Sequence, residues 1–302
     1  MPPRETRRGF LGKAAALAGA ATLWQQPSAQ AIEPIKRNGN SFFKFSLAAY
    51  SYRGLLTAKS PQFTLDDFIA DCAEMGLEGT ELTSYYFPAE PTPEYLRHLK
   101  QHSFLLGLDI SGTAVRNDFC FPAGEKRDAE LAHVKRWVDY AEIMSAPVIR
   151  IFSGHAHGTS DKEAHRLAVE GIEECCQYAG EHGVYLALEN HGGLTTTADG
   201  LLALVRDVQS PWFGVNLDTG NFRSADPYAD LARLAPYAVN VQVKVSIHPE
   251  GGKRQQADFS RLAQIVGDAG YRGYIVLEFE EREDPREACP RYMDELRGAF
   301  AG

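Results

Sequence analysis

Short apolar runs alternate with longer amphipathic stretches from residue 45 to the end of the chain. The runs are rich in Val, Ile, Leu and Phe, which is typical of buried strands, whereas the stretches between them repeat apolar residues at helical spacing. The runs predict strands at residues 45–52, 79–86, 105–112, 147–155, 184–190, 212–218, 240–247 and 273–280. The amphipathic stretches predict helices at residues 64–75, 93–103, 126–145, 161–182, 197–208, 227–235, 258–269 and 285–299.

This alternation of strand and helix predicts an α/β fold with a parallel sheet and helices outside it. Eight such units in a chain of 302 residues match the (β/α)8 TIM barrel, which typically needs about 250 residues. No linker, low-complexity stretch or charge block interrupts residues 41–302, so we expect residues 32–302 to form a single domain.

Residues 1–31 have the pattern of an export signal. Arg7 and Arg8 precede an Ala-rich apolar run at residues 9–24, and the small-residue site Ala29-Gln30-Ala31 follows it. Paired arginines before such a run indicate the twin-arginine route. The run contains a lysine and is shorter than the roughly 20 apolar residues that a membrane-spanning helix needs. We therefore expect cleavage near Ala31, a periplasmic protein, and no stable membrane insertion after signal removal.

The charge of the chain narrows the choice of partner. Asp and Glu number 40 against 31 Lys and Arg, which gives a formal net charge of −9 at pH 7. The predicted signal is itself basic, so its removal would leave the mature chain more acidic still. An acidic surface repels the phosphate backbone of DNA and RNA, and we therefore expect no nucleic-acid partner.

Four of the later apolar runs carry a polar residue of a type that binds metal ions. In chain order, these residues are Glu189, Asp218, Gln242 and Glu278. In a parallel barrel the carboxyl ends of the strands meet on one face, so we expect these side chains to converge there. Three carboxylates brought together repel one another unless a cation lies between them. Oxygen ligands suit Mn, Mg or Co, with Zn as an alternative, and the sequence therefore predicts one divalent metal ion.

Further polar residues accompany this set. Lys244 follows Gln242 by two positions, so both side chains face the same side of their strand. A buried lysine needs an anionic partner, which the carboxylates supply, and we expect Lys244 to act in catalysis. Residues at or beyond strand ends that we expect to bind substrate are His191, His155, Asn221 and Glu81, the last with a paired lysine as its alternative partner.

The segments ALENHGG, NLDTGN, VQVKV and VLEFE, at these spacings, resemble the sugar-phosphate isomerase/epimerase family of xylose-isomerase-like, metal-dependent TIM barrels. The resemblance covers essentially the whole mature chain. It implies that one divalent metal is held by Glu189, Asp218, Gln242 and Glu278. It also implies that Glu189 and Glu278 are the acid–base pair, as in the ketose 3-epimerases of that family.

The chain departs from the family pattern on two strands. The seventh strand of the family usually presents His in a V-H-V-K-D pattern, whereas here Gln242 stands in place of the His and Ser246 in place of the Asp. The sixth-strand motif often reads D-x-x-H, and here Asn221 takes the position of that His. Both replacements distinguish this chain from the ketose 3-epimerases.

A metal beside paired carboxylates supports proton abstraction next to a carbonyl group. We expect a metal-dependent isomerase or epimerase that acts through an enediolate on an unphosphorylated sugar or keto-sugar, because export favours a free sugar over a phosphate ester. Loss of a neighbouring oxygen from the same intermediate would make the protein a lyase or dehydratase acting on a keto-sugar or polyol. A sugar-binding barrel without turnover is a third alternative. The expected partner is a small-molecule sugar or polyol, and the sequence leaves a homo-oligomer open.

The export signal makes a direct prediction for the expressed protein. Mass spectrometry of the extracytoplasmic form should give a mature N-terminus close to Ile32, because cleavage is expected at the small-residue site. A double variant, Arg7→Lys with Arg8→Lys, keeps the charge but lacks the paired arginines, and it should remain in the cytoplasm as the precursor. An intact Met1 form of the unchanged protein, confined to the cytoplasm, would contradict the prediction.

Overall fold

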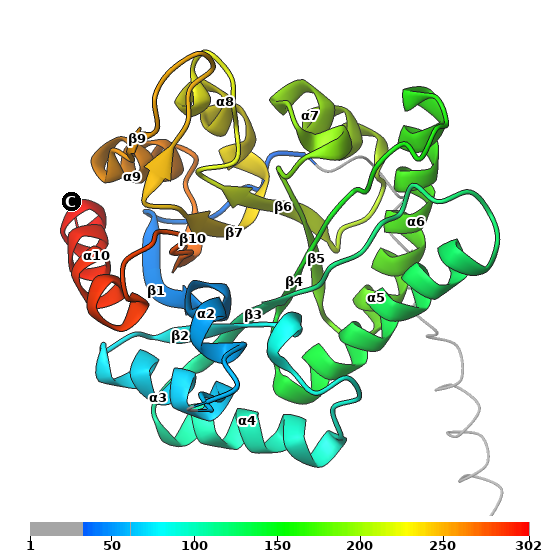
Figure 1. The fold of residues 1–302 in the computed structure, drawn as a ribbon. Helices are drawn as coiled ribbons and strands as arrows, with labels where there is room; N and C mark the ends of the chain where they lie inside the picture. The colour runs from blue at the N-terminus through cyan, green and yellow to red at the C-terminus, as the bar shows by residue number, and fades with distance from the viewer. Residues whose placement is uncertain (1–32, 61, 302) are drawn as a thin grey trace, which may run out of the picture.

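A closed barrel of eight parallel strands lies at the centre of the computed structural model, which describes residues 33–60 and 62–301 (Figure 1). Around the barrel the strands follow the order β1-β10-β7-β6-β5-β4-β3-β2, so the last strand closes onto the first. Their bounds are β1 (Phe42–Ala48), β2 (Gly79–Thr83), β3 (Asp109–Ala114), β4 (Val148–Ile151), β5 (Tyr185–Glu189), β6 (Phe213–Asp218), β7 (Ala238–Val243) and β10 (Arg272–Leu277). The predicted (β/α)8 barrel is confirmed.

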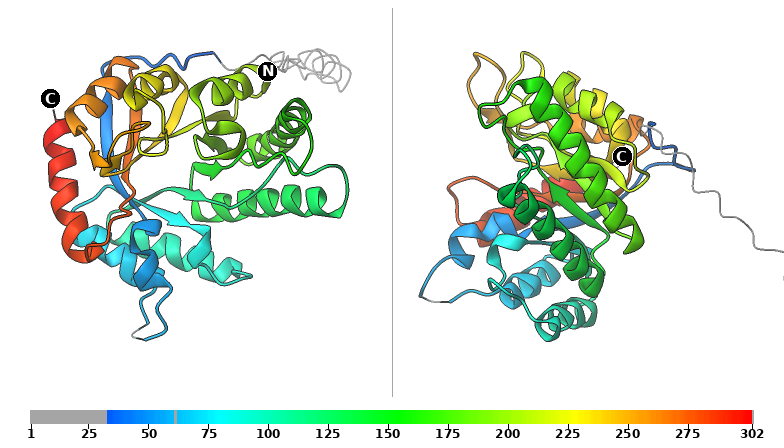
Figure 2. Two further views of the ribbon diagram at one scale, coloured as in Figure 1. Left: turned by 45° about the horizontal axis from the view of Figure 1, so that its top comes forward. Right: turned by 90° about the vertical axis from the view of Figure 1, so that its right-hand side faces the viewer.

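Helices connect successive strands and cover the outside of the barrel (Figure 2). They are α2 (Arg53–Leu56), α3 (Leu65–Glu74), α4 (Pro93–Leu105), α5 (Glu125–Met144), α6 (Asp161–Glu181), α7 (Ala198–Asp207), α8 (Pro227–Leu234), α9 (Phe259–Asp268) and α10 (Pro285–Phe300). Side chains cap many of the first turns. Thr64, for example, accepts a hydrogen bond from the Asp67 backbone N–H, and the Asp67 carboxylate accepts one from the Thr64 N–H. Such reciprocal capping fixes where a helix begins and so how long the preceding loop is.

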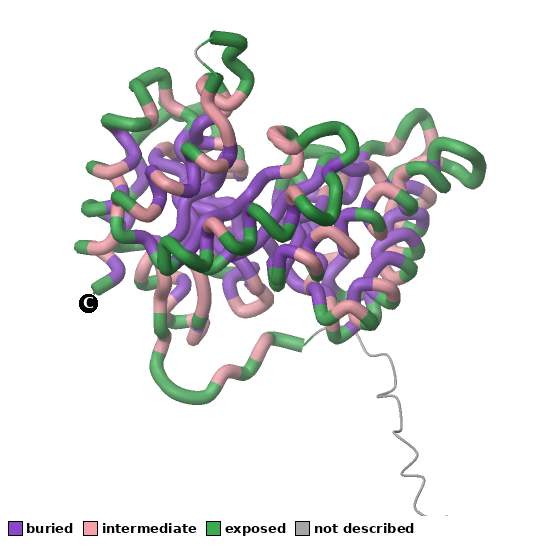
Figure 3. The backbone as a smooth tube through the Cα atoms, turned by 90° about the horizontal axis from the view of Figure 1, so that it is seen from below, coloured by how far each residue is buried: buried purple, intermediate pink, exposed green. Residues whose placement is uncertain are grey.

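Strand residues alternate between an apolar layer and a polar barrel interior. Leu186 and Leu188 of β5 are fully buried in the apolar layer between strands and helices. Figure 3 colours buried residues of every type purple, and they gather towards the middle of the molecule. Inside the barrel, Ser46 and Ser111 hydrogen-bond to each other at 2.7 Å. Bulky branched residues usually fill this space in TIM barrels. The polar interior of this barrel departs from that general pattern, and it continues into the residues described below.

The predicted strand at residues 105–112 is wrong at its start. Helix α4 extends to Leu105, and β3 begins only at Asp109. Leu105 and Leu106 are 74% and 41% exposed, so this apolar run lies at the solvent-exposed end of a helix and not in a strand. Gly107, with a φ of 79°, provides the left-handed conformation that ends the helix and turns the chain towards β3.

Five other predicted strands continue too far at the carboxyl end, those at residues 45–52, 79–86, 147–155, 240–247 and 273–280. A 3-10 turn at Ala49–Tyr52 follows β1, and β4 ends at Ile151. After β7, the segment Ser246–Ile247 (β8) pairs with Gln255–Gln256 (β9) in a separate antiparallel sheet. The chain leaves the barrel at these points, and its next residues form the loops around the carboxyl ends of the strands, which we call the mouth of the barrel.

The predicted export signal at residues 1–31 lies outside the described residues. The described chain begins near the amino end of β7. There the Ile35 N–H donates to the Pro236 carbonyl at 2.9 Å, and Arg37 Nη2 donates to the Ala238 carbonyl at 2.7 Å. Within residues 33–60 and 62–301, none of the helices has both the length and the apolar composition that a bilayer crossing requires.

The apolar layer makes a testable prediction. Leu188→Ala should lower the free energy of unfolding by about 2–5 kcal/mol, because it opens a cavity beside a fully buried strand. Leu105→Ala is the matched control, since the same atoms are removed from an exposed position, and it should stay within about 0.5 kcal/mol of the unchanged protein. Urea denaturation measures both values. Similar losses for the two variants would contradict this placement of the core.

Candidate active site

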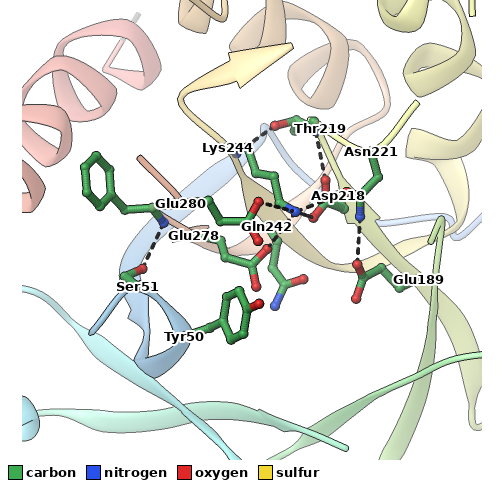
Figure 4. Close-up of polar contacts among 12 residues, drawn as sticks. Tyr50, Ser51, Glu189, Asp218, Thr219, Asn221, Gln242, Lys244, Glu278 and Glu280 are labelled. Carbon is green, nitrogen blue, oxygen red and sulfur yellow. Dashed lines mark hydrogen bonds and ion pairs between the residues drawn. The ribbon is translucent and has the colours of Figure 1, made fainter. Parts of the chain in front are cut away.

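Strands β5, β6, β7 and β10 bring the predicted metal ligands to one end of the barrel (Figure 4). Glu189 and Asp218 end β5 and β6, Gln242 lies one residue before the end of β7, and Glu278 directly follows β10. Asp218 is paired in register with Gln242 across β6 and β7. All four side chains are buried. The structure thus gathers them at the barrel mouth, while their roles as ligands and proton carriers stay predictions.

Lys244 lies among these carboxylates, just beyond β7. Its ammonium nitrogen is 3.2 Å from Asp218 Oδ2, 3.3 Å from Glu278 Oε2 and 3.1 Å from Glu280 Oε2. It also donates a hydrogen bond to Asn221 Oδ1 at 3.1 Å. Burial acts to lower the pKa of Lys244, but the surrounding carboxylates outweigh burial and raise that pKa well above its ordinary value. Lys244 therefore stays charged and offsets part of the negative charge of the mouth.

Glu189 is held by two neighbours on the other side of the mouth. Arg150 Nε lies 2.7 Å from Glu189 Oε2, and Asn221 Nδ2 donates to Glu189 Oε1 at 2.9 Å. Arg150 belongs to β4, is 5% exposed, and donates through Nη1 to the Val115 carbonyl at 2.7 Å. Both carboxylate oxygens of Glu189 are therefore engaged, which fixes the direction in which the group points.

The mouth is short of positive charge. Burial raises the pKa of Glu189 to about 7; Arg150 opposes this shift and Glu278 adds to it. Burial also raises the pKa of Asp218 above its ordinary value, with Lys244 opposing and the neighbouring glutamates adding to the shift. Asp218 Oδ2 is buried and makes no hydrogen bond among the described residues, so its polar contact there is the ion pair with Lys244 at 3.2 Å. The cations Arg150 and Lys244 face the carboxylates of Glu81, Glu189, Asp218, Glu278 and Glu280.

A closed ring of buried hydrogen bonds lies deeper in the barrel, and we call its members Glu81, Asn216, Asn240 and Gln242 the amide ring. Gln242 Nε2 donates to Glu81 Oε1 at 2.6 Å, and Asn240 Nδ2 donates to Glu81 Oε2 at 2.9 Å. Asn240 Nδ2 also donates to Asn216 Oδ1 at 2.8 Å, and Asn216 Nδ2 donates to Gln242 Oε1 at 2.6 Å. Each member is at most 2% exposed. Both oxygens of Glu81, an expected substrate contact, are thus occupied within the ring.

The two predicted substrate histidines lie at the rim. The His191 ring packs against Phe152 with 4.5 Å between centroids, and the Arg150 guanidinium lies 4.1 Å from the centre of the same phenyl ring. Partial burial and the cations Arg150 and Lys244 lower the pKa of His191, so its ring is neutral at pH 7. His155 is exposed, and its backbone N–H donates to a carboxylate oxygen of the Asp118 side chain at 3.2 Å. Asn221, in contrast, bridges Glu189 and Lys244 directly.

Several polar residues inside the predicted strands belong to the site but were not predicted to. Arg150 lies in the apolar run VIRIF, where a buried arginine needs an anion, so its position alone was a signal for a nearby carboxylate. Asn216 and Asn240 share a strand face with Asp218 and Gln242, because each pair is two residues apart. Strand parity could therefore have identified both asparagines.

Tyr50, which follows β1, was also missed. Figure 4 places it beside Glu278 and Gln242. Burial raises the pKa of Tyr50, and the negative charges of Glu280 and Glu278 raise it further. Its hydroxyl group is therefore protonated at neutral pH and can donate a hydrogen bond at the mouth.

A cavity of about 240 Å³ adjoins Lys244 on the side of β7 and β10, and its other lining residues include Asn221, Ser246 and His248. A larger cavity of about 1120 Å³ lies between α4 and α5. It is lined by Asp109, the first residue of β3, and by Pro147, which directly precedes β4. That end of the barrel holds the amino ends of the strands. TIM-barrel enzymes place their active sites at the carboxyl ends of the strands, and the smaller cavity lies at that end. It borders the candidate site through Lys244 and Asn221, and none of the four predicted metal ligands lines it.

Comparison with known proteins gives matches over most of the chain. A family model described as "Xylose isomerase-like TIM barrel" matches residues 69–297. An inosose dehydratase from Erwinia tasmaniensis is 26% identical over 271 residues, which cover 75% of this chain and 85% of that protein. 

Two solved structures illustrate the similarity in fold. D-Psicose 3-epimerase from Clostridium cellulolyticum H10 has a TM-score of 0.71 at 15% identity, over 85% of this chain and 99% of that one. A probable 3-DHS dehydratase from Bacillus anthracis has a TM-score of 0.59 at 20% identity, over 86% of this chain and 99% of that one. At these identities the two structures show a shared fold alone.

The position of Lys244 predicts a loss of stability when its charge is removed. Lys244→Met should lower the free energy of unfolding by about 3 kcal/mol in the presence of a chelator, because three carboxylates lose their shared cation. Lys253→Met, in an exposed loop, is the matched control and should change stability by less than about 0.5 kcal/mol. Urea denaturation at pH 7 compares them, and equal values would show that Lys244 contributes no net stability through these ion pairs.

Proposed function

Because this chain belongs to the xylose isomerase-like TIM barrel family, we propose that it is a metal-dependent enzyme that isomerises or epimerises an unphosphorylated sugar or keto-sugar. The observation that supports this best is the placement of Glu189 and Glu278 across the mouth, with Asp218 and Lys244 between them (Figure 4). Two carboxylates that flank one substrate can remove a proton next to a carbonyl and return a proton to another carbon or face.

The residues of the mouth fit a divalent cation by charge and by donor type. Within the described residues, no three His, Cys, Asp or Glu side chains form a ready metal cage, so the support for a cation is the chemistry of the site. Asp218 Oδ2 shares the Lys244 ammonium with Glu278 and Glu280, and the buried carboxylates of the mouth outnumber the two cations Arg150 and Lys244. The residues that would hold the ion are Glu189, Asp218, Gln242 and Glu278, whose oxygens suit Mn, Mg or Co, with Zn as the alternative. Such an ion, when bound, would polarise adjacent substrate oxygens.

The protein's own residues divide the remaining work. Glu278 and Glu189 carry the proton from one substrate position to another. Lys244 offsets negative charge on the enediolate or donates the returning proton, because its ammonium group already lies among the carboxylates. Asn221, between Glu189 and Lys244, and the neutral ring of His191 bind substrate hydroxyls. His155 reaches hydroxyls nearer the rim.

A lyase or dehydratase acting on a keto-sugar or polyol is the second candidate. It begins with the same proton abstraction, after which a neighbouring oxygen leaves instead of a proton returning. The similarity to an inosose dehydratase over 75% of the chain favours this reading. A barrel that binds sugar without turnover is the third candidate, and it differs from both enzymes in that it exchanges no substrate proton.

We further propose that the enzyme works in the periplasm, as a twin-arginine substrate. The support is the paired arginines at Arg7 and Arg8 with the following apolar run. A periplasmic enzyme meets free sugars, glycosides and polyols more readily than cytoplasmic phosphate esters, which is why the proposed substrate is unphosphorylated.

Proton exchange in deuterated water tests the proposed function. Metal-loaded protein is incubated with a panel of free sugars, keto-sugars and inososes, and NMR and mass spectrometry follow the products. Deuterium gain with an unchanged carbon skeleton and a new stereochemistry or carbonyl position supports the isomerase or epimerase. Loss of one water from the product identifies the dehydratase. Binding without any exchange across the panel would contradict both enzymes and leave the binding protein.

The role of Glu278 makes a quantitative prediction. Glu278→Gln keeps an oxygen donor, so it should retain much of the metal while kcat falls by about 10²–10⁴-fold, the typical contribution of a general acid–base group. Glu283→Gln, in an exposed surface ion pair, is the control and should keep near-normal kcat. Steady-state kinetics on metal-replete protein provides the values. If Glu278→Gln keeps near-normal kcat, the proton carrier lies elsewhere, and His155 is the next candidate.

A further inference from the structure

Gln242 occupies the strand-seven position at which the related family pattern has a histidine. An imidazole offers a ring nitrogen to a metal, whereas an amide carries an oxygen on one side and an NH2 group on the other. Only the oxygen attracts a cation. Gln242 therefore serves as a ligand only when its amide is held in one of its two orientations.

The amide ring holds that orientation. Both oxygens of Glu81 accept hydrogen bonds, and the Gln242 group that faces Glu81, 2.6 Å away, is the NH2. Burial raises the pKa of Glu81 to about 7, and the hydrogen bonds from Gln242 and Asn240 oppose that rise by favouring the carboxylate. The other oxygen of Glu81 likewise takes the NH2 group of Asn240, whose second N–H reaches Asn216 Oδ1. Asn216 in turn presents its NH2 group to Gln242 Oε1 at 2.6 Å. One carboxylate thus sets the direction of three amides.

We propose that Glu81 is a positioning residue that orients the Gln242 amide, so that its oxygen faces the cation site of the mouth. Figure 4 draws that oxygen on the side of Glu189 and the amide nitrogen on the opposite side. Gln242 Oε1 accepts one hydrogen bond in the ring, and its second lone pair is the one offered to the cation. The assignment replaces the substrate contact expected for Glu81, and it rests on the metal of the proposed function.

Because the amide ring is buried, the orientation of the Gln242 amide depends on its hydrogen bonds within the ring and not on solvent. Glu81 and Gln242 are each 1% exposed, and Asn216 is fully buried. Water is therefore not available to exchange for a ring partner, and an amide turned the wrong way would leave buried groups unpaired.

Two substitutions with opposite effects on charge test the proposal. Glu81→Gln removes a negative charge and the accept-only group, whereas Asn216→Asp adds a negative charge and removes the donor to Gln242 Oε1. Positioning predicts that both weaken binding of Mn²⁺ by about 10–100-fold, the typical effect of losing a group that orients a metal ligand. Charge alone predicts weaker binding for Glu81→Gln and tighter binding for Asn216→Asp. Titration of metal-free protein with Mn²⁺, followed by EPR of the free ion, measures affinity without a substrate.

A third substitution separates orientation from general damage to the barrel. Gln242→His supplies a ring nitrogen, which does not need the Glu81 carboxylate to orient an amide. In the Gln242→His background, Glu81→Gln should therefore change Mn²⁺ affinity far less than it does when Gln242 is present. Glu280→Gln is the matched control, because it removes a carboxylate that contacts Lys244 outside the ring, and it should have a much smaller effect than Glu81→Gln. Thermal unfolding with chelator identifies any variant that does not fold. If Glu81→Gln does not fold, the Mn²⁺ affinity of Asn216→Asp still tests the proposal.

The outcomes distinguish this proposal from the proposed function. An unchanged protein that binds no Mn²⁺ would overturn the metal and the positioning role together. Normal binding by the unchanged protein with near-normal binding by Glu81→Gln would overturn only the positioning role. Tighter binding by Asn216→Asp, or equal losses for Glu81→Gln and Glu280→Gln, would show that charge and not orientation sets the affinity.

Discussion

Buried negative charge at the carboxyl ends of the strands is the constraint on which the rest of the mouth depends. Closing the barrel places Glu189, Asp218 and Glu278 where little water reaches them, and like charges repel strongly in such surroundings. Lys244 and Arg150 each approach these carboxylates within 2.7–3.3 Å, yet burial outweighs their effect and raises the pKa of Glu189. A site of this kind takes up either protons or a further cation. Both are ingredients of chemistry next to a carbonyl group.

The polar interior of the barrel follows from the same constraint. Carboxylates and amides at the mouth need directional partners, and branched apolar side chains below them would offer none. The amide ring supplies these partners while leaving its own members satisfied, which is the condition under which a buried polar network adds rigidity. The apolar layer that stabilises the fold lies instead between strands and helices, where Leu186 and Leu188 are fully buried. The outward faces of the strands thus contribute to the stability of the fold, whereas their inward faces determine the geometry of the site.

Much of this arrangement could be predicted from the sequence, because strand ends in a parallel barrel converge whatever the details of packing. Glu189, Asp218 and Glu278 directly end or follow apolar runs. The alternation of strands and helices in the sequence, together with the barrel topology, was therefore enough to predict that they lie together. Pairing between side chains of different strands was not predictable in the same way. Arg150 could be recognised as needing an anion but not assigned to Glu189. The helix end at Leu105 was misread because an exposed apolar run has the same composition as a buried strand.

The fold alone does not separate the two proposed reactions, epimerisation and dehydration, and the proton donors of the site would have to do so. Both reactions begin with proton removal next to a carbonyl, and proteins named for each share this barrel. They diverge when a donor protonates either carbon or a departing oxygen. The mouth offers two proton donors, the ammonium of Lys244 and the protonated hydroxyl of Tyr50. In the proposed function, the orientation of the substrate would decide between the two reactions, because it would determine whether carbon or oxygen faces the nearest donor.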